Sequence, residues 1–347
     1  MPSFDTLFAL IACSALAGQT SEPRDVCGPA PEPSIQCEVT GFPACFNPHG
    51  DDGLTVSALP KLNGEPSPTV SALPKLDGEP APTPLTESVS WARGRTETYI
   101  PAGFWSSDGK YDLLLHFHGA PSRVETAFQA SDFDHTVLVT VNLGLGSGPY
   151  EDRFAAPAAF PQLLESIQNA LAQRAPTKNL RLGRVALSAW SAGYGAVKQI
   201  LTQAEHRSRI DAVLLADGLH AGFVNPTQRI IYAPKLAPFV AFAEEATQGT
   251  KLMVVAHSSI RTTGYASTTE TARHLLRSVG LQPHPIEGQQ VEGMALTSSV
   301  EMRGFHVQGY AGADARAHVD HLAHIDGTLL RQLSAWWTRP ADRTAAR

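Results

Sequence analysis

A serine between a strand and a helix is the first residue of this sequence that could carry out chemistry. Residues 185–187 form an apolar run, Ser191 follows them, and residues 197–204 carry apolar side chains at helical spacing. A sharp turn between a strand and a helix exposes a serine hydroxyl for attack, provided that the neighbouring residues are small. Ala189 and Gly193 meet that requirement. The pattern therefore predicts that Ser191 is a nucleophile.

A serine hydroxyl attacks at neutral pH only when an adjacent base accepts its proton. The closing segment of the chain offers three histidines, His318, His321 and His324. His318 precedes Leu322 by four residues, so it lies on the same inward face of the expected helix. His321 is offset towards Thr328, on a wetter stripe, and His324 is expected at the surface. We expect His318 to be the base and keep His321 as the alternative.

The base in turn needs a carboxylate that orients it. The first strand after Ser191 ends in Asp217, whereas the second ends in residues 255–259, which contain no carboxylate. Asp211 begins the first of these strands and therefore belongs to the opposite end of the sheet. We expect Asp217 to orient the imidazole. Its alternative role is to hydrogen-bond the turn at Gly218.

Runs of apolar and β-branched residues alternate with helical patterns from residue 91 onwards. Strands are expected at residues 96–101, 111–117, 136–141, 182–187, 210–216, 251–256 and 305–310, and helices at residues 160–171, 197–204, 236–247, 268–278 and 317–337. Near-continuous apolar strands are typical of a sheet that is covered on both faces. The alternation favours parallel strands that are connected by helices. One α/β domain over residues 91–347 is therefore expected.

In this order, the motifs resemble those of the α/β-hydrolase superfamily, in a form similar to bacterial esterases and lipases. The resemblance rests on residues 116–119 (His-Phe-His-Gly), on residues 189–193 (Ala-Trp-Ser-Ala-Gly) and on the late histidine. The superfamily usually has glycine where this chain has Ala189. The resemblance implies a three-layer α/β-hydrolase sandwich, with a mostly parallel central sheet and helices on both faces. It also implies a serine hydrolase that cleaves a carboxylic ester through an acyl-enzyme.

Acyl transfer also needs two backbone N–H groups that face the developing oxyanion. One directly follows the nucleophile, at Ala192. The resemblance implies that the other belongs to the loop after the early strand, at Ala120. Four further residues are expected to contact the substrate: His118, Gly119, Trp190 and Tyr150. No cofactor and no metal ion is implied.

Two other interpretations remain open. His116 and His118, together with His318 and His321, could offer four imidazoles to a zinc ion, although no cysteine or carboxylate accompanies them. A non-catalytic binding module at the cell surface is favoured by the missing carboxylate after residues 251–256. A metal site would leave the serine motif without a role, so we prefer the serine esterase.

The composition sets bounds on size and on partners. The chain has 347 residues, of which 43% are hydrophobic, and this is enough for a sizeable core. Its formal net charge is −6 and 17% of its residues are charged, so it lacks the excess of basic residues that is typical of nucleic-acid-binding proteins. The charge favours a small, neutral substrate, and the resemblance implies that this substrate is an ester.

The first twenty residues are expected to be a secretory or lipoprotein leader. Residues 7–12 form an apolar run that is too short to span a bilayer and that resembles the core of a secretory signal. Residues 10–13 (Leu-Ile-Ala-Cys) resemble a bacterial lipobox, whose lipidated Cys13 would attach the chain to a membrane. All four cysteines lie within the first 45 residues. We therefore expect an exported protein, either secreted or held in the cell envelope as a lipoprotein.

Residues 21–90 are expected to be a proline-rich, cysteine-containing linker. Residues 55–66 return almost unchanged as residues 69–80, at a fourteen-residue period. Two copies are too few for a solenoid, and frequent prolines keep such a segment extended. The segment would separate the leader from the domain that begins at residue 91.

Overall fold

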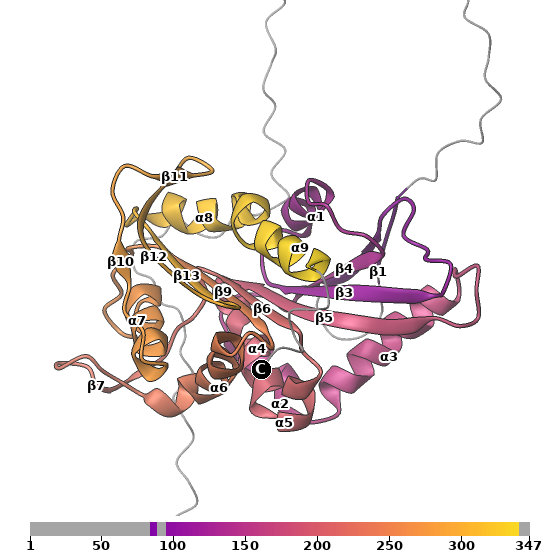
Figure 1. The fold of residues 1–347 in the computed structure, drawn as a ribbon. Helices are drawn as coiled ribbons and strands as arrows, with labels where there is room; N and C mark the ends of the chain where they lie inside the picture. Colours follow the sequence, from indigo (N-terminus) through magenta and orange to yellow (C-terminus); the bar gives the residue numbers. More distant parts are fainter. Residues whose placement is uncertain (1–83, 89–94, 340–347) are drawn as a thin grey trace, which may run out of the picture. The chain divides into compact units, whose positions relative to one another are not determined.

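The computed structural model describes residues 84–88 and 95–339 (Figure 1). Its strands are β1 (Leu85–Ser88), β2 (Arg95–Ile100), β3 (Lys110–Phe117), β4 (Thr136–Asn142), β5 (Arg181–Trp190), β6 (Ala212–Ala216), β7 (Phe223–Asn225), β8 (Ile230–Ile231), β9 (Leu252–His257), β10 (His284–Pro285), β11 (Gln290–Val291), β12 (Met294–Met302) and β13 (Phe305–Tyr310). In the described residues, eleven of these strands form one sheet in the order β1-β2-β4-β3-β5-β6-β9-β13-β12-β10, with β11 paired to β12. Strands β7 and β8 form a separate hairpin.

The centre of the large sheet is parallel. Strand β3 runs parallel to β4 and β5, and the parallel pairing continues through β6 and β9 to β13. Strands at the two sides, β1, β2, β10, β11 and β12, pair antiparallel with their neighbours. The predicted mostly parallel sheet is therefore confirmed.

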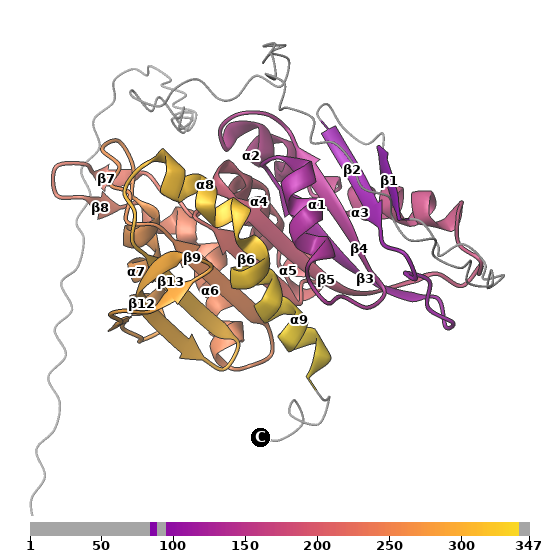
Figure 2. The same ribbon diagram turned by 90° about the horizontal axis from the view of Figure 1, so that it is seen from above.

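Helices cover both faces of this sheet. They are α1 (Pro121–Gln129), α2 (Gly148–Ala155), α3 (Ala159–Ala172), α4 (Tyr194–Thr202), α5 (Ala204–Ser208), α6 (Ala237–Thr247), α7 (Thr268–Ser278), α8 (Ala315–Ala323) and α9 (Arg331–Thr338), with the short turns η1 (Ser191–Gly193), η2 (Ala233–Leu236) and η3 (Asp326–Leu330). Figures 1 and 2 show α1, α8 and α9 on one face, and Figure 1 shows α3, α4, α6 and α7 on the other. The three-layer α/β sandwich that the resemblance implied is confirmed.

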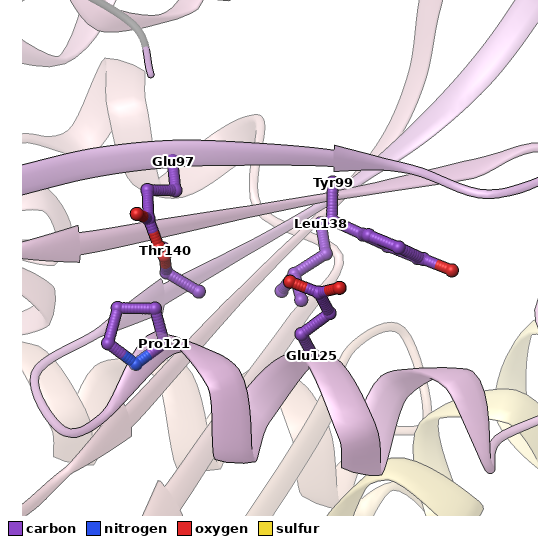
Figure 3. Close-up of a pocket in the computed structure, with 6 residues that line it drawn as sticks. All are labelled: Glu97, Tyr99, Pro121, Glu125, Leu138 and Thr140. Carbon is purple, nitrogen blue, oxygen red and sulfur yellow. The ribbon is translucent and has the colours of Figure 1, made fainter. Parts of the chain in front are cut away.

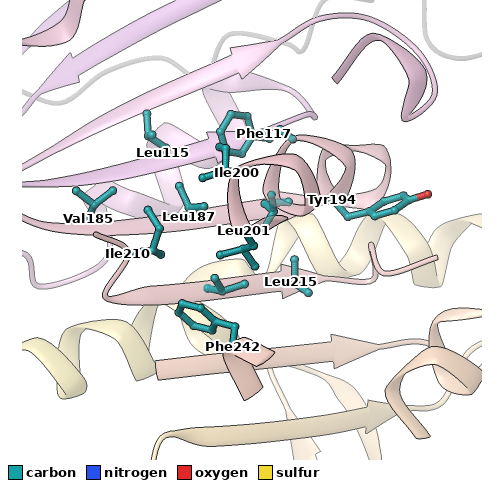
Figure 4. Packing of buried hydrophobic residues seen from close by; sticks show 14 of the residues in the cluster. Leu115, Phe117, Val185, Leu187, Tyr194, Ile200, Leu201, Ile210, Leu215 and Phe242 are labelled. Carbon is teal, nitrogen blue, oxygen red and sulfur yellow. The ribbon is translucent and has the colours of Figure 1, made fainter. Parts of the chain in front are cut away.

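The strands divide their side chains between the two layers. Successive side chains of a strand point to opposite faces. Leu114 of β3 packs in the cluster that includes α1, α8 and α9, whereas its neighbours Leu113 and Leu115 pack in the cluster that includes α3, α4 and α6. Figure 4 shows Leu115 in that second cluster, with Leu187 of β5 and Ile200 of α4. Both faces of the central strands are therefore dry, as their continuous apolar sequence predicted.

The closing helix is not continuous. The sequence predicts one helix over residues 317–337, but α8 ends at Ala323 and a π-helical turn, η3, leads into α9. The predicted inward stripe is nevertheless buried at Leu322, Ile325, Leu329 and Leu333. The stripe holds α8 against the sheet, so the first turn of α8 lies at the carboxyl edge of the central strands.

The N-terminal predictions lie mostly outside the described residues. These include the leader at residues 1–20, the duplication at residues 55–80 and all four cysteines. Strand β1 lies inside the range predicted to be linker, and it pairs with β2. Among the residues that the structure describes, no helix has the length and apolar character needed to cross a bilayer.

Candidate active site

Ser191 lies on a strained turn directly after β5. Its φ angle is +48°, in the left-handed region that non-glycine residues rarely adopt. The turn is possible only because its neighbours are small. A Cβ atom on Gly193 would overlap the carbonyl group of Phe117, and one on Gly218 would lie 2.6 Å from the carbonyl oxygen of Ser191. The backbone therefore passes close to Gly193 and to Gly218 on the two sides of Ser191. Strained backbone angles such as that of Ser191 cluster at functional sites.

Asp217 and His318 form a hydrogen-bonded pair. The Nδ1 atom of His318 lies 2.7 Å from Oδ2 of Asp217. Asp217 follows the last residue of β6, and its side chain is only 2% exposed, whereas that of His318 is 21% exposed. Gly218 lies against the backbone of Ser191. Asp217 directly precedes Gly218, so its carboxylate is close to the serine turn.

Two further donors hold the other oxygen of Asp217. The backbone N–H of Ser258 donates to Oδ1 at 2.9 Å, and the hydroxyl of Thr268 donates to the same atom at 2.6 Å. Burial alone would raise the pKa of Asp217, but the hydrogen bond from His318, the nearby His321 and the Ser258 amide together hold it well below its ordinary value. The carboxylate is therefore ionised throughout the neutral range.

Trp190 joins the histidine to the serine turn. Its indole N–H donates to the backbone oxygen of His318 at 2.9 Å, and the two rings stack with centroids 4.7 Å apart. Since Trp190 directly precedes Ser191, it fixes the first turn of α8 next to the nucleophile. In the described residues, the His318 imidazole bonds to Asp217 and not to Ser191. Hydrogen bonds of catalytic groups commonly tighten only when substrate binds.

His321 occupies a different environment from the one expected. The prediction of a wetter stripe is wrong, because His321 is 1% exposed and packs edge-to-face on Tyr310, with ring centroids 5.4 Å apart. Its Nδ1 atom has no hydrogen-bond partner among the described residues. Burial lowers the pKa of His321 to about 4. Of the two candidate bases, the structure therefore brings His318 and not His321 into hydrogen bonding with Asp217.

His116 shapes the loop before α1. Its Nε2 atom lies 2.9 Å from the carbonyl oxygen of His118, which can only accept, so Nε2 carries the proton. Nδ1 then accepts from the hydroxyl of Ser188, also at 2.9 Å. Burial lowers the pKa of His116 to about 4, which keeps the ring neutral. Both nitrogens are therefore occupied by protein groups.

The four histidines of the zinc alternative do not form a ligand set. In the described part of the chain, no three or more His, Cys, Asp or Glu side chains lie close enough together to hold a metal ion.

The two predicted oxyanion donors lie at neighbouring strand ends. Ala192 is inside η1, and Ala120 directly precedes α1. Phe117 at the end of β3 pairs with Ala189 in β5, so the two segments leave the sheet side by side. Apart from bonds internal to helices and strands, neither alanine N–H donates to a backbone acceptor in the described residues. Their places at adjacent strand ends suit the two donors of an oxyanion hole.

The residues predicted to face the substrate divide into two groups. Tyr150 is fully buried, and its hydroxyl lies 3.0 Å from Nδ1 of His118 and accepts from the amide of Leu143. It therefore holds the loop that carries His118. Gly119 has a φ angle of +103°, and a Cβ atom there would lie 3.2 Å from the ring of Trp190. His118, Gly119 and Trp190 thus pack together beside the serine turn.

Sequence reasoning missed two of the groups around the carboxylate. Ser258 acts through its backbone, which no sequence pattern marks. Thr268 begins a helix that the sequence does predict, but its contact with Asp217 joins positions 51 residues apart. Only the folded sheet reveals it.

A narrow surface crevice that has no room for a water molecule lies between β2, β4 and α1 (Figure 3). It is lined by Glu97, Tyr99, Pro121, Glu125, Leu138 and Thr140. None of these residues belongs to the predicted site.

Several solved structures are similar to this chain at low sequence identity. Ferric enterobactin esterase from Salmonella typhimurium is 12% identical over 75% of this chain, with a TM-score of 0.41, and the chain spans 59% of its length. Est1E from Butyrivibrio proteoclasticus is 9% identical over 73% of this chain and 99% of its own, with a TM-score of 0.40. A feruloyl esterase module from Clostridium thermocellum is 10% identical over 69% of this chain and 85% of its own, with a TM-score of 0.39.

No protein-family model matches the chain, and no curated protein matches it in sequence. The fold is assigned on the strand order of the chain itself. A parallel core in the order β4-β3-β5-β6-β9-β13, with helices on both faces and a serine turn directly after β5, is a three-layer α/β sandwich in which Ser191 lies between a strand and a helix.

Proposed function

We propose that this chain is a serine hydrolase that cleaves a carboxylic ester through an acyl-enzyme. The observation that carries the proposal is the Asp217–His318 hydrogen bond of 2.7 Å beside the strained turn at Ser191. A buried carboxylate that orients an imidazole beside a serine is the arrangement of a catalytic triad, and it recurs on unrelated folds. The N–H groups of Ala120 and Ala192, which lie at adjacent strand ends, add a place for the oxyanion.

The proposed reaction has two halves. The oxygen of Ser191 attacks the ester carbonyl while Nε2 of His318 takes its proton, and the oxyanion binds to the two alanine N–H groups. The carbon–oxygen bond of the ester then breaks, and the alcohol leaves with the proton from His318. Water attacks the acyl-serine in the same way, which releases the acid and regenerates Ser191. Asp217 remains ionised and holds the proton on Nδ1 of His318 throughout.

A fluorophosphonate probe tests the nucleophile directly. We expect the folded protein to be labelled on Ser191, whereas Ser191→Ala takes up no probe. His318→Gln should slow labelling by orders of magnitude, and His321→Gln should leave it close to the wild-type rate, because, of these two histidines, His318 is the one that bonds to Asp217. Labelling that a chelator leaves unchanged excludes a metal-dependent reaction. Folded protein that is not labelled would contradict the hydrolase and favour a binding module.

We also propose that the chain is exported. The apolar run at residues 7–12 and the lipobox-like residues before Cys13 motivate this proposal. Fractionation of the producing cells should place the processed chain outside the cytoplasm, and metabolic labelling with a fatty acid distinguishes a lipoprotein, which takes up the label, from a secreted chain, which does not. Cys13→Ala should abolish the lipid label. A full-length chain that remains in the cytoplasmic fraction would contradict export.

A further inference from the structure

Thr268 contacts the candidate acid from the side opposite the histidine. Its hydroxyl donates to Oδ1 of Asp217 at 2.6 Å, while His318 binds Oδ2 at 2.7 Å. Thr268 is 4% exposed, so water does not compete for this bond. The two oxygens of the carboxylate are therefore held by different elements, one by α7 and one by α8.

The hydroxyl of Thr268 is not needed to begin its helix. Ser267 is the N-cap of α7, and its side chain accepts from the backbone N–H of Glu270, whose carboxylate accepts in return from the amide of Ser267. This capping box already satisfies the exposed donors of the first turn. The hydroxyl of Thr268 is therefore not required for capping α7, and it donates its hydrogen bond to Asp217 instead.

A single bond to a carboxylate leaves the group free to rotate about its last torsion. Asp217 is at the end of β6, and its backbone N–H donates to the oxygen of Ala256 at 2.8 Å, which fixes the main chain. The torsion of the side chain is fixed by the donors on Oδ1, namely the amide of Ser258 and the hydroxyl of Thr268. Of these two, only Thr268 contributes a side chain that substitution can remove.

From this geometry we infer that Thr268 is a positioning residue: it orients the carboxylate of Asp217 so that Oδ2 faces Nδ1 of His318. The inference rests on the proposed function, because it assigns a role through the candidate acid. A hydrogen bond to the ionised carboxylate also stabilises the anion that must persist while the imidazole is protonated. In the described residues the side chain of Thr268 bonds to Asp217 and not to Ser191, so its effect on the reaction passes through Asp217.

The test compares Thr268→Val with Thr268→Ser in steady-state hydrolysis of a soluble aryl ester. Thr268→Val keeps the volume and removes the donor, and we expect kcat to fall about tenfold to a hundredfold, as for the loss of one hydrogen bond to a charged group. KM should stay within about twofold, since the change is behind the acid. Thr268→Ser restores the donor and should recover most of kcat.

Thr271→Val is the matched control. Thr271 lies one turn further along α7, is fully buried, and donates to the backbone oxygen of Leu219 rather than to Asp217. Both valine variants should lower the melting temperature, but Thr271→Val should keep kcat within about threefold. Equal losses of kcat in the two valine variants would show a structural role only and would overturn the inference.

Parallel measurements on Ser191→Ala and Asp217→Asn separate the two proposals. If both of these variants lose activity while Thr268→Val keeps its kcat, the positioning role is overturned and the hydrolase proposal stands. If Asp217→Asn retains near-normal activity, the assignment of the acid fails, and the role of Thr268 fails with it.

Discussion

Two aspartates at opposite ends of β6, one buried and one half-buried, have different partners. Asp217 follows the carboxyl end of the strand and binds His318, whereas Asp211 precedes it and accepts from the backbone N–H of Val185 at 2.8 Å. Burial raises the pKa of Asp211, while the pKa of Asp217 is lowered. The pKa of an aspartate is thus shifted in opposite directions at the two ends of one short strand.

Asp217→Asn should therefore lower kcat by about four orders of magnitude without unfolding the chain, because an amide favours the wrong imidazole tautomer. Asp211→Asn keeps an acceptor for Val185 and should leave kcat within about threefold of the wild type. Ester hydrolysis and far-ultraviolet circular dichroism of both variants provide the check. A comparable loss of kcat in both would locate the effect in the strand and not in the acid.

At the level of single residues, the sequence predicts what has a local signature. The serine turn is predicted by an apolar strand before it, the small residues Ala189 and Gly193 on its two sides, and a helix after it. Asp217 is predicted as the acid because the end of the next strand has no carboxylate. In the structure, the Ser258 amide at the end of that next strand donates to Asp217. The burial of His321 could not be predicted, since it depends on Tyr310, which β13 brings beneath α8.

Among the elements, the β7–β8 hairpin is tied to the start of α7 by an ion pair. Both guanidinium contacts between Arg229 and the carboxylate of Glu270 measure 2.6 Å. The hydrogen bond from Arg229 is the main reason why the pKa of Glu270 is lowered to about 2 from an ordinary value of 4.5. The hairpin is thereby fastened to the same helix that holds Asp217.

Glu270→Gln should preserve the capping box, which accepts glutamine, and remove the ion pair. A carboxylate with a lowered folded pKa stabilises the native state above pH 4.5 and loses that contribution as the pH falls towards 2. The partly exposed pair should account for a melting-temperature difference of about 1–3 °C near neutral pH. Scanning calorimetry from pH 7 to pH 2 should show this difference narrowing below pH 4.5. A constant difference down to pH 2 would contradict the assignment.

Strand β12 shows which elements the sequence does not reveal. The central strands are continuous apolar runs, so they were predicted close to their observed positions. Strand β12 lies near the side of the sheet, and Ser298 and Ser299 interrupt the alternation of buried and exposed residues along it. Its pairing with β13 depends on the turn between them, and no strong periodicity marks it. The break in the closing helix at η3 has no clear sequence signal either.

For the whole molecule, several neutral histidines are buried around the carboxyl edge of the sheet. Burial lowers the pKa values of His116, His118, His220 and His321 to about 4, from an ordinary value of 6.5. The unfolded chain therefore binds protons between pH 6.5 and pH 4 that the folded chain does not bind. By linkage, the folded state must lose stability as the pH falls through this range.

The free energy of unfolding should accordingly fall by about 1.4 kcal/mol per pH unit for each such proton. Urea unfolding at pH 7, 6 and 5 measures this slope. His321→Gln should reduce the slope by up to one proton, since one of the buried imidazoles is removed. Equal stability of the wild-type protein at pH 7 and pH 5 would show that these rings are protonated without cost in the folded state.

Left-handed backbone angles occur at three residues of the site, His118, Ser191 and Asp217, with φ values of +72°, +48° and +42°. Each such conformation costs a non-glycine residue on the order of 1 kcal/mol. The described chain has four more such residues, His135, Arg229, Glu292 and Arg303, but only at the proposed site would this strain set activity against thermal stability. Selection for heat resistance alone would favour glycine at these three positions, and the most stable relatives of this sequence would then be inactive ones.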